Sequence, residues 1–217
     1  MSTSLETSPT GTHAARTTRA LLAALAVSAP LWIVVSLAQA FTQPGFDLAR
    51  HPISMLSVGP LGWLQITNFI VAGSLAVAGA IGLRRAVPSR WAPRLIAVYG
   101  VGYVLSGVFV MEPGAGFPEG TPMETSGTLA WHTVVHLLVG MVAFIALTAA
   151  LFVLARAFAW RGEKSWAWAA RIGAIAVIAG NALSSAQLFA PSLDLAIGVM
   201  TGMVVLSLIA AKLRREA

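Results

Sequence analysis

The sequence predicts an all-α polytopic integral membrane protein, a bundle of six transmembrane helices with both termini in the cytoplasm. Hydrophobic residues make up 57% of the 217 residues and charged residues only 10%, whereas soluble domains are about one quarter charged. The apolar residues fall into runs of roughly 17–27, which is the length that crosses a hydrocarbon core of about 30 Å. The basic residues are confined to segments between these runs, as topogenic charges are.

The apolar runs predict the elements in order. Backbone groups in lipid must bond internally, and no strand-length alternation appears, so each run is expected to be a helix. The first run is too long for the core of a signal peptide and is expected to be an uncleaved span. Residues 1–18 are expected to form a disordered tail, 19–212 the transmembrane domain and 213–217 a basic C-terminal tail. The spans are expected at about 20–40, 62–83, 95–111 (open to extension toward Trp91), 129–155, 172–190 and 194–211.

The charge distribution predicts the orientation. Thirteen of the fourteen Lys and Arg residues lie in one set of segments, whereas the alternate segments hold only Arg50 together with five of the eight acidic residues. Because positive loops stay cytoplasmic, the loops 41–61, 112–128 and 191–193 are expected to face outward from the plasma membrane. The net charge of +6 does not indicate nucleic acid, since no basic stripe is interleaved with aromatic residues. The absence of cysteine excludes thiolate metal sites and cysteine nucleophiles.

Polar residues gather in the outer halves of five predicted spans. This pattern indicates a hydrated cavity that is open to the outside and closed below by apolar side chains. A solute pathway would be polar in both halves, so the pattern disfavours a channel or an ion-coupled transporter. The residues are Ser36, Gln39, Gln65, Thr67, Asn68, Tyr103, Ser106, His132, His136, Asn181, Ser184, Ser185 and Gln187.

Three histidines are expected near the outer face. His132 and His136 have i, i+4 spacing and project from one side of a helix. Such a pair can converge on one metal ion, as in the helical motif His-Glu-x-x-His, although the Glu of that motif is absent. His51 is the candidate third ligand, and three histidines suit zinc with one position open for water, although imidazole also binds copper, iron and nickel. The alternative is that each histidine bonds a Ser, an Asn or a backbone carbonyl of an adjacent helix.

Candidate catalytic groups surround this predicted metal site. Asp47 or Glu112 would act as a base or orient an imidazole. Asp194 is a weaker candidate, because an acid at the start of the last span simply complements the helix dipole. Pro52 is expected in the first turn of a short helix, which places Ser54 on the same face as the third histidine. Ser54 would be an oxyanion donor, a partner of a ligand or a helix-terminal hydroxyl, and no Gly-x-Ser-x-Gly elbow marks it as a nucleophile.

Two longer stretches support a family resemblance. The segment "FDLARHPISMLSVGPLGWLQITNF", and "EPGAGFPEGTP" followed by "HTVVH", resemble the domain-of-unknown-function family 998, six-helix integral membrane proteins mostly of bacteria. The most specific part is His51-Pro52-Ile53-Ser54, and an Asp is usual in that family where this chain has Glu112. The resemblance implies the fold and topology but no activity. A looser analogy of chemistry links His51, His132, His136, Ser54 and Asp47 to membrane hydrolases resembling alkaline ceramidases, which use zinc.

Two functions follow from these patterns. The first is a metal-dependent hydrolase that acts on a lipid or amphiphile at the outer leaflet. The second is a non-enzymatic binding or sensing protein whose outer pocket receives a lipid or a small molecule. Haem is a weaker third idea, because histidines at i, i+4 on one helix cannot clamp both faces of a ring. The sequence leaves the oligomeric state open.

Overall fold

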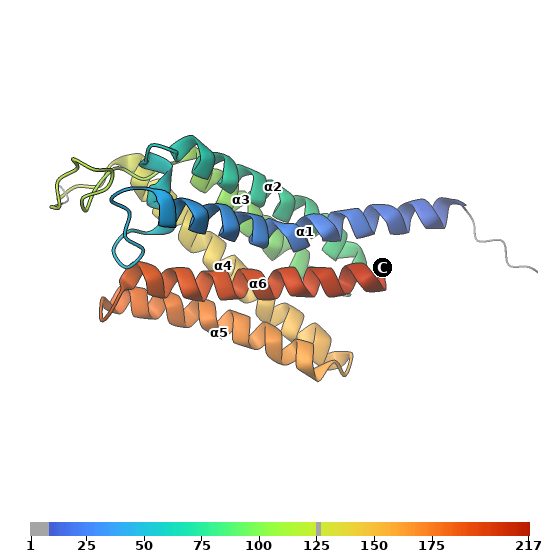
Figure 1. Cartoon of the computed structure of the whole chain (residues 1–217). Helices are drawn as coiled ribbons and strands as arrows, with labels where there is room; N and C mark the ends of the chain where they lie inside the picture. The colour runs from blue at the N-terminus through green and yellow to red at the C-terminus, as the bar shows by residue number, and fades with distance from the viewer. Residues whose placement is uncertain (1–8, 125–126) are drawn as a thin grey trace, which may run out of the picture.

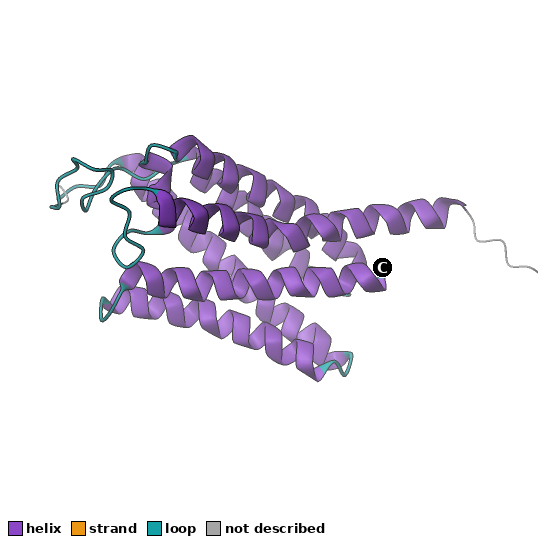
Figure 2. Cartoon of the chain, viewed as in Figure 1, coloured by secondary structure: helices purple, strands orange, loops and turns teal. Residues whose placement is uncertain are grey.

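The computed structural model of the chain describes residues 9–124 and 127–217, which form a bundle of long helices (Figure 1). No strand occurs in these two ranges, and the connections are loops and turns (Figure 2). The elements are α1 (Pro9–Thr42), the 3₁₀ helix η1 (Ile53–Val58), α2 (Gly62–Ala86), α3 (Trp91–Val108), α4 (Trp131–Trp160), α5 (Lys164–Ala186) and α6 (Pro191–Glu216).

The connections gather at two opposite ends of the bundle (Figure 1). We call one end the loop end, which carries residues 43–61, 109–124, 127–130 and 187–190. We call the other the basic end, which carries the start of α1, residues 87–90 and 161–163, and the C-terminus. At the basic end Glu163 joins α6 to the α4–α5 turn, because its carboxylate lies 2.6 Å from both Arg161 and Lys212.

Each helix packs against its neighbours in the chain, and the last helix packs against the first. α3 lies between α2 and α4, α5 lies between α4 and α6, and α6 returns to α1. Small residues permit the closest crossings. A Cβ on Gly73 would lie 2.5 Å from the Gly100 carbonyl oxygen, and one on Gly198 would lie 2.5 Å from the Ala176 carbonyl oxygen and 2.8 Å from the Gly180 Cα. Small residues at helix interfaces are typical of membrane bundles, where association depends on close van der Waals contact.

The predicted class is confirmed in its coarse form. Five of the described helices, α1, α2, α4, α5 and α6, are long and apolar enough to cross a membrane. α3 is not among them: it has 18 residues, so any 18-residue stretch of it includes Pro93 and Arg94 of the first turn, which lower the mean hydropathy. It begins at Trp91, the position to which the third span was open to extension.

Several predicted boundaries differ from the structure. α1 begins at Pro9, so residues 9–18 are helical rather than part of a disordered tail, and residues 1–8 lie outside the described range. The hydroxyls of Thr17 and Thr18 donate to the carbonyls four residues earlier, which lets these polar residues continue the helix. The C-terminal tail is also helical through Glu216, where Lys212 pairs with it one turn away.

Candidate functional site

The two long connections at the loop end fold together into a cap, defined here as residues 43–61 and 109–124. At its centre the ring of His51 packs against Phe46 and Phe117, with centroids 5.4 and 5.5 Å apart, and these two phenylalanine rings lie 5.2 Å from each other. His51 and Phe117 are buried, with exposures of 1% and 0%. The segment that contains His51 is therefore part of a packed structure rather than a loose loop.

Both ring nitrogens of His51 have backbone partners. Nδ1 accepts a hydrogen bond from the Asp47 N–H at 3.0 Å. Since a neutral imidazole has one acceptor and one donor nitrogen, Nε2–H donates to the Ala115 carbonyl at 2.9 Å. The histidine thus joins the two connections of the cap, and in this arrangement neither nitrogen is available to a metal.

Asp47 and Ser54 lie close to His51 in the chain, but their side chains contact other groups. The Asp47 carboxylate is about half exposed, lies 3.9 Å from Arg50 and accepts a hydrogen bond from the Ala49 N–H at 2.9 Å. The expected short helix is present as η1, but it is a 3₁₀ helix and Pro52 precedes it rather than entering its first turn. The Ser54 hydroxyl donates to the Met111 sulfur at 2.9 Å, which is a weak acceptor.

His132 and His136 turn toward the end of α3. The Nδ1–H of His132 donates to the Val110 carbonyl at 2.7 Å, and that of His136 donates to the Phe109 carbonyl at 2.7 Å, with the Ser106 carbonyl 3.1 Å away. The last carbonyls of a helix have no partner within the helix. His136 therefore caps the C-terminus of α3, and His132 bonds the connection two residues beyond it. Both bonds are the backbone-carbonyl alternative stated above.

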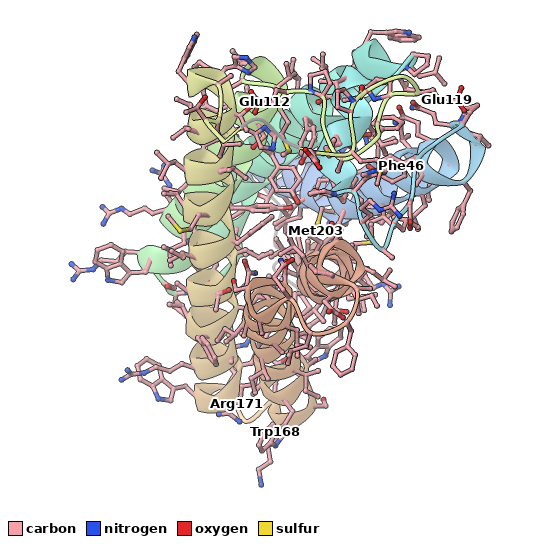
Figure 3. The ribbon with its side chains drawn as sticks, turned by 90° about the vertical axis from the view of Figure 1, so that its left-hand side faces the viewer. Phe46, Glu112, Glu119, Trp168, Arg171 and Met203 are labelled. Carbon is pink, nitrogen blue, oxygen red and sulfur yellow. The ribbon has the colours of Figure 1, made fainter. Side chains whose placement is uncertain are left out.

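Glu112 has a matching role at the start of α4. The predicted span ended at residue 111, but α3 ends at Val108, so Glu112 lies in the connection, at the loop end of the bundle (Figure 3). The Glu112 carboxylate accepts a hydrogen bond from the Ala130 N–H at 2.8 Å, and the backbone N–H of Glu112 donates to the Thr133 hydroxyl at 2.9 Å. An acid here satisfies a helix N-terminus and complements its dipole.

The predicted three-histidine set is not assembled. Within residues 9–124 and 127–217, no group of three or more His, Asp or Glu side chains is arranged to hold a metal ion. His51 is bonded within the cap, whereas His132 and His136 are bonded to the end of α3. The donors therefore do not fit the expected zinc site, and we derive no catalytic step through Asp47, Ser54 or Glu112.

The polar residues predicted to line one outer cavity do not do so together. Thr67 and Ser185 are exposed and donate to carbonyls of their own helices, and two other groups lie inside the bundle.

The first group is an internal network between α1 and α2. Gln65 is fully buried, and its amide oxygen accepts a hydrogen bond from Gln39 at 2.8 Å while its amide nitrogen donates to Ser36 at 3.1 Å. Asn68 donates to the Trp32 carbonyl at 3.0 Å. These side chains satisfy one another, so they do not line a hydrated space.

The second group lines a cavity of about 280 Å³ beneath η1. Its wall combines aromatic, aliphatic and a few polar side chains from η1 and all six helices. In the part of the chain that the structure describes, no Asp, Glu, Lys or Arg lines it. The lining residues are Trp32, Pro52, Ile53, Ser54, Phe69, Tyr103, Ser106, Met111, His136, Leu137, Gly140, Met141, Phe144, Asn181, Ser192, Leu195, Ala196, Val199 and Met200.

Polar atoms in this wall are poorly satisfied. The indole N–H of Trp32 is buried and has no acceptor among the described residues. The Tyr103 hydroxyl donates to the Met203 sulfur, a weak acceptor, at 3.2 Å. Trp32 is not among the candidate residues that the sequence patterns indicate. The available signal was its depth, since tryptophans in membrane proteins favour the interfaces and this one lies in the middle of the first apolar run.

The cavity opens on the side of the bundle. Leu137 and Met141 belong to its wall yet are 47% and 52% exposed on the outer surface of α4. α4 and α5 are joined by a turn at the basic end and diverge toward the loop end (Figure 1). Trp168 and Arg171 of α5 lie near that turn, and Met203 of α6 lies in the interior of the bundle (Figure 3). In a bilayer such an opening faces lipid.

The fold and this cavity define a polytopic α-helical membrane protein with a ligand-sized internal space. The family model described as Protein of unknown function (DUF998) matches residues 26–212, and the chain belongs to this family. The match confirms the resemblance found in the sequence. No curated protein and no solved structure matches the chain.

Proposed function

We propose that the protein binds an amphiphilic molecule, taken from the bilayer, in the cavity beneath η1. The observation that carries this proposal is a mostly apolar cavity whose wall reaches the exposed surface of α4 at Leu137 and Met141 and contains the buried, unpartnered indole N–H of Trp32. Ligand sites are typically concave and largely apolar, with a small number of placed polar groups. The binding alternative is preferred to metal-assisted hydrolysis because His51 already uses both ring nitrogens within the cap.

We also propose that all six helices cross the plasma membrane, with both termini in the cytoplasm. α2 and α4 both run from the loop end to the basic end (Figure 1), so the chain between them must return across the bilayer, and α3 is that segment. Its 18 residues extend about 27 Å, close to the thickness of the hydrocarbon core. The concentration of Arg and Lys at the basic end supports the orientation.

The orientation has a direct test because the chain contains no cysteine. Thr128→Cys and Ser165→Cys place single thiols at exposed positions of the loop end and the basic end. We expect a membrane-impermeant maleimide to label Thr128→Cys in intact cells and Ser165→Cys only after lysis. The reverse pattern would overturn the orientation.

Cavity binding is tested by filling the space. Gly140 lines the cavity, and a Cβ added there meets no atom within 4 Å, so Gly140→Phe is expected to fill the cavity without a backbone clash. Ile145→Phe is the matched control, since this residue of the same helix is 62% exposed. The probe is a straight-chain alcohol with a photoreactive diazirine, added to protein in nanodiscs, and peptide mapping gives the labelled residues.

We expect saturable labelling of cavity residues in the wild type and in Ile145→Phe, and at least a tenfold loss in Gly140→Phe. Equal labelling in the two variants, or labelling that does not saturate, would refute the proposed function.

A further inference from the structure

Building on the proposed function, we propose that the ligand of this cavity carries an uncharged hydroxyl head, which accepts a hydrogen bond from Trp32 and donates one to His136. A hydroxyl group offers both an acceptor and a donor. Trp32 and His136 in the wall offer the complementary donor and acceptor, and most of the other lining residues are apolar.

The donor in the wall is the indole N–H of Trp32. Trp32 is 5% exposed, lines the cavity, and its Nε1 has no acceptor among the described residues. An indole nitrogen can only donate, and a buried donor without a partner carries a desolvation penalty. A ligand oxygen would remove that penalty.

The acceptor in the wall is Nε2 of His136. Its Nδ1–H is already directed to the Phe109 and Ser106 carbonyls, so the neutral ring keeps a lone pair on Nε2. Both side chains pack on Phe69, with ring centroids 5.6 Å away for Trp32 and 6.2 Å away for His136. The donor and the acceptor therefore flank one aromatic ring.

The wall also argues against a charged head. Burying an unpaired charge is strongly unfavourable, and none of the described lining residues is an acid, a lysine or an arginine. An aromatic cage for a quaternary ammonium group is the competing arrangement. However, Trp32, Phe69 and Tyr103 pack directly on one another, with all three centroid distances between 5.5 and 5.6 Å. They form one wall and leave no space for a cation between them.

The volume limits how much of the ligand is enclosed. A cavity of about 280 Å³ is roughly twice the 150 Å³ that accommodates benzene. Because the cavity has about twice that volume, the part of the ligand inside it has on the order of ten to fifteen non-hydrogen atoms. Any longer chain would leave through the opening beside Leu137 and Met141 into the bilayer.

The test is competition against the diazirine alcohol in nanodiscs. The competitors are four molecules of equal chain length: an alcohol, a carboxylic acid, an alkane and a trimethylammonium. We expect the alcohol to compete at least threefold better than the other three, because the acid is ionised at neutral pH and the alkane has no head. The variants are Trp32→Phe and His136→Asn. The second places an amide N–H where Nδ1–H caps α3 and removes Nε2.

We expect each variant to weaken competition by the alcohol three- to tenfold, the effect of losing one hydrogen bond, and to leave competition by the alkane unchanged. An unchanged melting temperature in His136→Asn shows that the cap of α3 is retained. If the alkane equals the alcohol, or both variants leave the alcohol unaffected, the hydroxyl head is refuted while cavity binding stands. A preference for the acid or the trimethylammonium competitor refutes it as well. Labelling that Gly140→Phe does not reduce refutes the proposed function itself.

Discussion

His51→Phe tests whether this histidine holds the cap together. Phenylalanine keeps an aromatic ring between Phe46 and Phe117 but removes both nitrogens. The Asp47 N–H and the Ala115 carbonyl then lose their partners. Because the ring of His51 is only 1% exposed, water cannot replace the nitrogens without moving the cap.

The magnitude follows from these two bonds. Removing one partner of a buried hydrogen bond costs about 1–3 kcal/mol. Asp47 and Ala115 are themselves only partly buried, so the lower half of that range applies to each bond. We expect a loss of about 2–4 kcal/mol in the free energy of cap opening. Part of this loss is local, because the cap can open while the helices stay packed.

Hydrogen–deuterium exchange measured by mass spectrometry separates the two regions. We expect faster exchange by roughly thirty- to several-hundredfold in peptides from 43–61, with little change in the interior of α4 or α6. His13→Phe is the matched control, because His13 is exposed on α1 and should leave the cap unchanged.

Metal analysis of the purified wild type and of His51→Phe tests the opposing hypothesis that His51 is a metal ligand. If His51 is a ligand, the wild type binds one metal ion per chain and His51→Phe loses it. That result, or unchanged exchange in residues 43–61, would refute the role of His51 in holding the cap.

Three further substitutions test the packing and the helix ends. Gly198→Val should destabilise the α5–α6 contact by more than 2 kcal/mol, because its Cβ would lie 2.5 Å from the Ala176 carbonyl oxygen, and thermal unfolding in detergent measures this. Glu112→Gln should cost about 0.5–1 kcal/mol, since the amide oxygen still accepts from Ala130 but the charge at the start of α4 is lost. Gln65→Leu should cost about 2 kcal/mol, because it removes the shorter of the two acceptors of the Gln39 amide and the donor to the Ser36 hydroxyl. Equal melting temperatures for wild type and variant would contradict the corresponding contact.

The sequence predicted the long helices because apolar run length and the positions of proline and glycine between the runs are local signals. Pro52 and Gly59 correctly indicated a short helix in the first connection. The start of α1 was missed because a polar composition is shared by disordered tails and by the exposed end of a long helix. Here the hydroxyls of Thr17 and Thr18 bond within the helix, which composition does not reveal.

The candidate site was predicted in part. Spacing placed His132 and His136 on one face of α4, and both do turn to the same neighbour, α3. Their partners are backbone carbonyls, which every residue possesses, so no sequence pattern distinguishes this arrangement from a metal site. The association of His51 with that pair was inferred from a shared side of the membrane, and a shared side does not establish contact.

The structural and functional roles of the histidines on α4 are compatible, because each ring has two different nitrogens. In each residue, donation of Nδ1–H to a backbone carbonyl at the end of α3 or just beyond it fixes the tautomer and leaves Nε2 as an acceptor. The difference lies in depth, since His136 borders the cavity and His132, one turn nearer the loop end, is not among its described lining residues. His132→Asn and His136→Asn should therefore preserve these backbone bonds alike, and only the second should weaken competition by the alcohol. Equal weakening in both variants would show that the backbone bonds, rather than Nε2 of His136, govern binding.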